Sequence, residues 1–175
     1  MTIAMTAAPP VLTLDELSAL RCRDLRALFH EGLVPERFSA LNGRPKGRLL
    51  ALEYLDRGPL FSITKTVANL RGFVWDGKSF ASTGKRCGVG HNRINLLVRE
   101  AEWFHFKTRV DKSGLDGKAC IRVDYGLPEN PWPVNRLRDE LREVSPGLYL
   151  GVMLWQAGYR AHPLLWFAID ARLQC

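Results

Sequence analysis

Residues 102–125 constrain the fold of this chain most, because they have the pattern of a long β-hairpin. Two arms of alternating apolar and polar side chains flank the Gly-containing run 111–117. Since successive side chains of a strand point to opposite faces, each arm has one apolar and one polar face. A register that matches the two apolar faces pairs His105 with Asp124. The pattern leaves open whether the polar face meets solvent or looks into a cavity.

Other segments also have strand patterns. Asp76-Gly77, between apolar flanks in residues 72–80, indicates a two-residue hairpin turn. The segments 148–156 and 164–170, joined by a turn around 157–162, are apolar on both faces, which is typical of strands that are covered on both sides or that face an apolar interior. Further strands are expected over 48–55 and around Ile94, Leu96 and Val98.

Helices are predicted near both ends of the chain. Thr13 and Glu16 have the spacing of a capping box, which begins a helix that ends near Gly32. Residues 130–133, Asn-Pro-Trp-Pro, precede apolar side chains at helical spacing from Val134 to Val144, and this spacing predicts a second helix. Residues 60–70 are interpreted as a short helix.

These elements predict a mainly β (α+β) fold. The expected architecture is an antiparallel β-barrel of six to eight strands, with an N-terminal helix and a second helix before the C-terminal hairpin. Residues 1–12 lack periodicity and are expected to be a flexible tail, while residues 13–175 form a single β-barrel domain.

The composition limits which binding partners and which cellular compartment are expected for this chain. The formal net charge is +7, but the 25 Lys and Arg residues are scattered rather than clustered, so a nucleic-acid partner is not expected. The apolar segment 148–169 is interrupted by Gly158, Arg160 and Pro163, which argues against a membrane partner. The absence of a secretory signal pattern and of Cys-x-x-Cys pairs predicts a cytoplasmic protein of bacterial type with reduced thiols.

Two short motifs resemble the lipocalin-like (calycin) barrels. One bacterial group of these barrels has a Gly-x-Trp-x-Gly stretch followed by a Trp/Tyr-x-Gly-Lys-x-Phe stretch. Residues 43–47, Gly-Arg-Pro-Lys-Gly, fall where the first would be, and residues 75–80, Trp-Asp-Gly-Lys-Ser-Phe, match the second. Pro45 departs from the first motif, because it stands where the aromatic residue would be. The resemblance implies a binding cavity and implies no reaction.

Large side chains in the predicted strands are candidates for lining such a cavity. A pocket for a small molecule is typically apolar and aromatic, with a few polar groups. The same residues could instead form an ordinary filled core. The candidate ligand-binding residues are Tyr54, Trp75, Trp103, Tyr149, Met153, Trp155 and Trp166.

The polar face of the central hairpin supplies candidate catalytic residues. If that face looks inward, His105 is a general base oriented by Asp124, and Arg109 or Tyr125 stabilises developing negative charge. If it looks outward, the same groups are solvated surface charge. The spacing of His91, His105 and His162 does not indicate a metal site.

The first functional hypothesis is therefore hydrophobic ligand binding, in which a lipocalin-like barrel holds a small hydrophobic or aromatic molecule. The second is an enzyme of small-molecule metabolism, an isomerase or cyclase that uses the same cavity without a cofactor. Nucleic-acid binding through the basic surface is the weakest. A monomer or a homodimer is compatible with the sequence.

Overall fold

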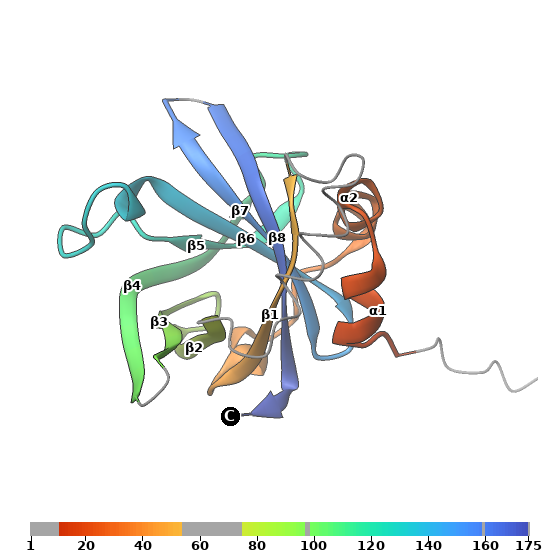
Figure 1. Cartoon of the computed structure of the whole chain (residues 1–175), viewed down its shortest axis with the longest axis horizontal. Helices are drawn as coiled ribbons and strands as arrows, with labels where there is room; N and C mark the ends of the chain where they lie inside the picture. Colours follow the sequence, from red (N-terminus) through yellow and green to blue (C-terminus); the bar gives the residue numbers. More distant parts are fainter. Residues whose placement is uncertain (1–10, 54–74, 97–98, 159, 175) are drawn as a thin grey trace, which may run out of the picture.

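Eight antiparallel strands close into a barrel in the computed structural model, which describes residues 11–53, 75–96, 99–158 and 160–174 (Figure 1). Each strand pairs with the next along the chain, and the last pairs with the first. The strands are β1 (Pro45–Leu52), β2 (Trp75–Gly84), β3 (Cys87–Leu96), β4 (Arg99–Lys112), β5 (Ala119–Asp124), β6 (Leu137–Ser145), β7 (Leu148–Ala157) and β8 (Arg160–Gln174). The prediction of a mainly β fold with a closed antiparallel barrel is confirmed.

The central hairpin exists as β4 and β5, but its register differs from the one predicted. Lys107, rather than His105, is opposite Asp124. The slip of two residues preserves the match of apolar faces, which the alternation of side chains requires. The loop sets the register: Ser113 N–H donates to Lys118 O at 2.8 Å, and Glu140 of β6 accepts from Gly114 N–H at 2.7 Å.

The apolar face of this hairpin points into the barrel. Phe106, Ile121 and Val123 are buried in an interior cluster with residues of β2, β6, β7 and β8. His105 and Lys107, on the opposite face, are exposed. The orientation that the sequence left open is thereby settled, and the charged face of β4 is outer surface.

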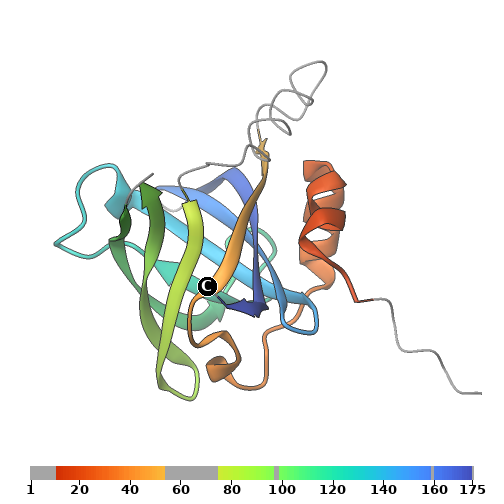
Figure 2. The ribbon, with the colours of Figure 1, turned by 60° about the horizontal axis from the view of Figure 1, so that its bottom comes forward.

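Two helices, α1 (Leu14–Ala19) and α2 (Cys22–Glu31), cover the outside of the barrel on one side (Figure 2). The predicted capping box is present, with Glu16 N–H donating to Thr13 Oγ1 at 3.2 Å. The single predicted helix is interrupted at Leu20 and Arg21. In a continuous helix, Arg21 would fall within the buried stripe, and the interruption leaves it exposed.

The strands beneath the helices are buried on both faces, as their sequences predicted. Leu148, Leu150, Val152 and Leu154 of β7 pack outward against α1 and α2, whereas Tyr149 and the other alternate residues face the interior. The turn between β7 and β8 lies where it was expected.

The predicted second helix is wrong, because residues 137–145 form strand β6. Only Val134–Arg136 is helical, as the short 3-10 helix η3. The apolar spacing that suggested a helix is also met by a strand in which Leu137 and Leu141 face the interior. Two polar residues between these leucines, Asp139 and Glu140, are buried, and each contacts a residue that is distant in sequence.

The predicted hairpin turn at Asp76-Gly77 is also wrong, because β2 continues through both residues and turns at 85–86. Gly77 has a φ of 131° and pairs with Lys46 of β1. A Cβ at Gly77 would lie 2.6 Å from Pro45 O. Glycine is therefore required at position 77 because β1 and β2 approach each other closely, and not because the chain turns there.

The interpretation of residues 60–70 as a helix lies outside the described residues. No helix within the described ranges is both long and apolar enough to cross a membrane.

Candidate functional site

A cavity of about 240 Å³ lies inside the barrel. All of the strands except β5 contribute side chains to its wall, and Tyr125, just after β5, contributes as well. The interior beyond it is filled by large side chains that include Phe38 and Leu41 of the 3-10 helix η1 (Phe38–Leu41). The described residues lining the cavity are Leu49, Trp75, Lys78, Asn92, Ile94, Phe104, Tyr125, Val134, Leu137, Met153, Leu165 and Phe167.

Three polar side chains gather on the wall of this otherwise apolar cavity. Lys78 Nζ donates to Asn92 Oδ1 at 2.7 Å and also to the hydroxyl of Tyr125. Asn92 Nδ2 donates to the Tyr125 hydroxyl at 3.1 Å. Lys78 and Asn92 are opposite each other in the neighbouring strands β2 and β3, and Tyr125, which follows β5, reaches them across the interior of the barrel.

Asp139 of β6 completes this network. Its Oδ2 lies 2.9 Å from Lys78 Nζ and accepts from the Tyr125 hydroxyl at 2.8 Å. The side chains of Lys78 and Asp139 are 1% and 0% exposed, respectively. A charged group at such depth requires both a partner and hydrogen bonds, and the network supplies both.

Burial dominates the electrostatics of the network. It lowers the pKa of Lys78, an effect that Asp139 opposes by its charge and its hydrogen bond. Burial, and next the charge of Asp139, raise the pKa of Tyr125 well above its usual value. Tyr125 is therefore a neutral phenol at physiological pH and acts as a hydrogen-bond donor to Asp139.

Aromatic rings surround the ammonium group of Lys78. Its Nζ lies 5.1–5.5 Å from the ring centroids of Trp75, Phe106, Tyr125 and Phe167. Such contacts stabilise a cation in a poorly hydrated place. They also make an apolar, aromatic environment for any group next to this lysine.

The predicted ligand-binding residues differ in their position relative to the cavity. Trp75 and Met153 line the cavity, and Tyr149 belongs to the interior cluster without being a lining residue. Trp155 is half-buried near the end of β7. Tyr54 lies outside the described residues.

Two predicted ligand-binding tryptophans point away from the cavity. Trp103 is 47% exposed on the outer surface. Trp166 faces outward beneath α2, where it packs edge-on against Phe29 at a centroid distance of 5.8 Å. Its Nε1 donates to Glu53 at 2.6 Å. The two placements follow from the orientation of β4 and β8.

The predicted catalytic group is not assembled. Only Tyr125 lines the cavity, while His105 and Arg109 are exposed on the outer face. Asp124 lies 3.8 Å from Arg109 Nη1 and is not paired with His105. The structure therefore does not bring His105 and Asp124 together inside the barrel, where the sequence-based hypothesis placed them.

Sequence reasoning missed Lys78, Asn92 and Asp139. Lys78 lies two residues before Phe80 and so shares its inward face, and a charge on an apolar strand face was the available signal. Asp139 lies between Leu137 and Leu141, but its inward position was hidden by the helix prediction. Asn92 was missed because it lies just before the strand predicted around Ile94, Leu96 and Val98 and was not included in it.

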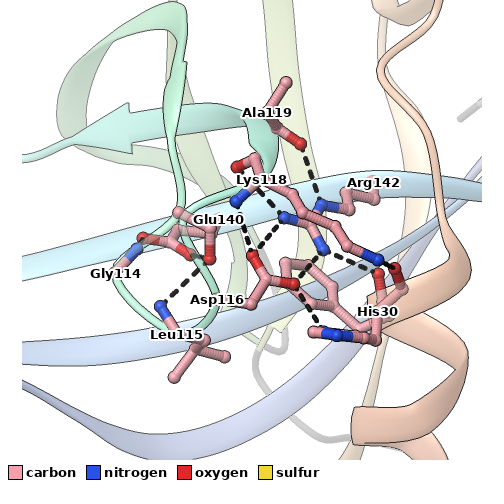
Figure 3. Close-up of polar contacts among 10 residues, drawn as sticks. His30, Gly114, Leu115, Asp116, Lys118, Ala119, Glu140 and Arg142 are labelled. Atoms are coloured by element: carbon pink, nitrogen blue, oxygen red, sulfur yellow. Dashed lines mark hydrogen bonds and ion pairs between the residues drawn. The ribbon is translucent and has the colours of Figure 1, made fainter.

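A second buried polar cluster lies outside the barrel, between α2 and the β4–β5 loop (Figure 3). Arg142, fully buried, binds both carboxylate oxygens of Asp116 at 2.7 Å and donates to Phe29 O at 3.0 Å. His30 Nδ1 also lies 2.7 Å from Asp116 Oδ2. Arg142 and Asp116 bind to each other and to groups of α2, so these contacts fasten α2 to the barrel.

Among the residues that the structure describes, no three His, Cys, Asp or Glu side chains form a group that could hold a metal ion.

Comparison with known proteins identifies a fold relative and no family. No protein-family model matches the chain, and no curated protein matches it. A solved structure described as a protein from Thermomonospora curvata superposes with a TM-score of 0.54 at 15% sequence identity, covering 90% of this chain and 94% of that one. At this identity the similarity establishes the fold alone.

Proposed function

We propose that the barrel binds one small, largely apolar molecule in the cavity, in the manner of a lipocalin-like protein. The observation that carries this proposal is an apolar cavity of about 240 Å³ with a compact polar group, Lys78, Asn92 and Tyr125, on its wall. Ligand sites combine these two features, because apolar walls provide affinity and a few polar groups fix orientation. The volume lies below the roughly 300–1,000 Å³ of pockets for drug-sized ligands, which favours a smaller molecule.

The backbone at Phe104 supports the same proposal. Phe104 lines the cavity at an irregularity of the β3–β4 pairing and has a φ of 57°. A positive φ is costly for a residue with a large side chain and tends to persist at functional sites. The strained backbone here shapes the cavity wall.

The resemblance to lipocalin-like barrels gains support from the contact between its two motifs. Gly47 and Gly77 approach so closely that a Cβ at Gly47 would lie 2.5 Å from Gly77 Cα and 2.7 Å from the ring of Trp75. The motif residues therefore close the barrel between β1 and β2 and place Trp75 and Lys78 at the cavity.

Binding of the neutral fluorophore N-phenylnaphthylamine tests the proposal. The expected result is a saturable increase in fluorescence with one site per chain. The variant Met153→Trp fills the cavity and should weaken binding at least about tenfold, whereas Trp103→Phe, on the outer surface, should leave it unchanged. Native mass spectrometry of protein purified from its own host should show a retained small molecule. Equal binding by the Met153→Trp variant would refute the assignment of the cavity.

A second candidate is an enzyme that acts by proton transfer in the same cavity without a cofactor. The favouring observation is the buried contact of Tyr125 with Lys78 and Asp139, which joins a phenol, an ammonium and a carboxylate. Such a group can donate and accept protons next to an apolar substrate. Exchange of a ligand's C–H protons for deuterium, catalysed by the wild type and lost in Tyr125→Phe, would distinguish catalysis from binding.

A further inference from the structure

Lys78 is the only charged residue among the described side chains that line the cavity, and its donors are already used. Its three N–H groups go to Asn92 Oδ1, the Tyr125 hydroxyl and Asp139 Oδ2. An ammonium group has three donors and no more. A ligand carboxylate could therefore bind Lys78 only by displacing an existing partner.

The charge of the network leads to the same conclusion. With Lys78 protonated and Asp139 ionised the pair is neutral, and transfer of the proton from Lys78 to Asp139 leaves it neutral. If the burial that lowers the pKa of Lys78 removes its proton altogether, the pair becomes negative. In each case a bound carboxylate adds an uncompensated negative charge to a buried site, which is strongly unfavourable.

Two groups close to Lys78 have hydrogen-bonding capacity that the network does not use. Asn92 Nδ2 has one N–H beyond the bond that it donates to Tyr125. Asp139 Oδ1 is buried and has no hydrogen-bond partner within the described part of the chain. Asn92 lines the cavity and Asp139 does not, so the group that a ligand meets is the remaining Asn92 N–H, a neutral donor from which a hydroxyl oxygen can accept.

We infer that the cavity selects neutral molecules that carry a hydroxyl or phenol group on an apolar body, and that it discriminates against the corresponding carboxylates. This inference deepens the proposed binding function and rests on it. It reverses the simple expectation that a buried lysine in a basic protein is a carboxylate-binding site. Lys78 acts instead as a positioning residue that holds Tyr125, Asn92 and Asp139 in place.

A matched ligand series tests the inference with the wild-type protein alone. Cinnamyl alcohol, cinnamate and propenylbenzene share one apolar body and differ in their polar end. Displacement of N-phenylnaphthylamine near neutral pH should show cinnamyl alcohol binding at least about tenfold more tightly than cinnamate and more tightly than propenylbenzene. Cinnamate binding as tightly as the alcohol would overturn the inference, even with the binding function intact. Failure of the fluorophore and of every ligand to bind would instead contradict the proposed function.

The variant Asp139→Asn tests the electrostatic cause. Removing the carboxylate leaves the charge of Lys78 uncompensated, so the preference for alcohol over cinnamate should fall at least about tenfold. Asp124→Asn, the same change on the outer face, should leave the preference intact. Circular dichroism checks that each variant is folded. An unchanged preference in folded Asp139→Asn protein would overturn the inference. If that variant does not fold, the wild-type series decides alone.

Discussion

Lys78 and Asp139 form an ion pair across the barrel, with Nζ and Oδ2 2.9 Å apart and both side chains inaccessible to solvent. They come from β2 and β6, which are not neighbours in the sheet. A pair of this kind joins opposite walls through the interior. Because isolated buried charges are strongly unfavourable, each residue depends on the other.

Removing one partner of this pair should lower the free energy of unfolding much more than removing both partners. We expect Lys78→Met to lower the free energy of unfolding by about 3–5 kcal/mol, since Asp139 is left as an unpaired buried carboxylate. The double variant Lys78→Met, Asp139→Leu should recover most of that loss, because no charge remains buried. Urea unfolding followed by circular dichroism measures both values.

The surface pair of Arg23 and Asp24 provides the control. Its side chains are 82% and 43% exposed, so Arg23→Ala should change the free energy of unfolding by less than about 1 kcal/mol. Additive losses in the Lys78–Asp139 double variant would mean that the two residues do not depend on each other.

The local alternation of side chains was sufficient to predict the barrel and its central hairpin. Phe106 and Val123 are apolar in a strand pattern, and both face the interior as that pattern requires. The register was not predictable from alternation alone. It is set by the loop, whose Ser113 and Gly114 are held by Glu140 of β6, a residue distant in sequence.

The candidate site was largely unpredictable for a related physical reason. Polar residues in β6, such as Asp139 and Arg142, look like the solvent face of an amphipathic helix until their partners are known. Those partners, Lys78 and Asp116, are contributed by β2 and by the β4–β5 loop. Periodicity describes the burial of apolar groups, and it says little about charges that are buried in pairs.

The Asp116–Arg142 contact should make part of the stability depend on pH. Hydrogen bonds from Arg142, aided by the N–H of Lys118 and opposed by burial, hold the pKa of Asp116 well below its usual range. Because the pKa of Asp116 is lower in the folded state than its unfolded value of about 3.9, the ionised carboxylate stabilises the folded protein above about pH 3.9. This stabilisation is lost as the pH falls toward the pKa of the folded state. Asp116→Asn should therefore cost about 2–3 kcal/mol near neutral pH and progressively less below about pH 4.

Thermal or urea unfolding at several pH values measures this dependence. Asp111→Asn is the matched control, since Asp111 is partly exposed and contacts Arg109 and Arg122 at the surface. Its cost should stay below about 1 kcal/mol. A cost for Asp116→Asn that is the same at low and neutral pH would contradict the role of its ionised form.

Substitution of Gly77 should disrupt the closure of the barrel. Alanine there would place a Cβ 2.6 Å from Pro45 O and 2.8 Å from Gly47 N, at a φ of 131°. Because these are backbone atoms, relief requires β1 and β2 to separate. We expect Gly77→Ala to lower the free energy of unfolding by about 2–4 kcal/mol.

Gly117 offers a control that isolates the crowding from the positive φ. Its φ is 73°, and a Cβ at this position would meet no atom within 4 Å. Gly117→Ala should therefore cost only about 1 kcal/mol in the same urea titration. Equal costs at the two glycines would show that close contact between β1 and β2 is not what requires Gly77.

Substitutions of two tryptophans, the partly buried Trp75 and the fully buried Trp166, should separate effects on ligand affinity from effects on stability. Trp75 lines the cavity and donates to Asn92 Oδ1 at 3.1 Å, whereas Trp166 packs outside the barrel against Phe29. Trp75→Phe should weaken N-phenylnaphthylamine binding about tenfold, because it removes apolar wall and releases Asn92. Trp166→Phe should leave affinity within about twofold while lowering the free energy of unfolding by about 1–2 kcal/mol through loss of the bond to Glu53. Fluorescence titration and urea unfolding of both variants give the comparison. A loss of affinity in Trp166→Phe as large as that in Trp75→Phe would show that binding does not occur in the barrel interior.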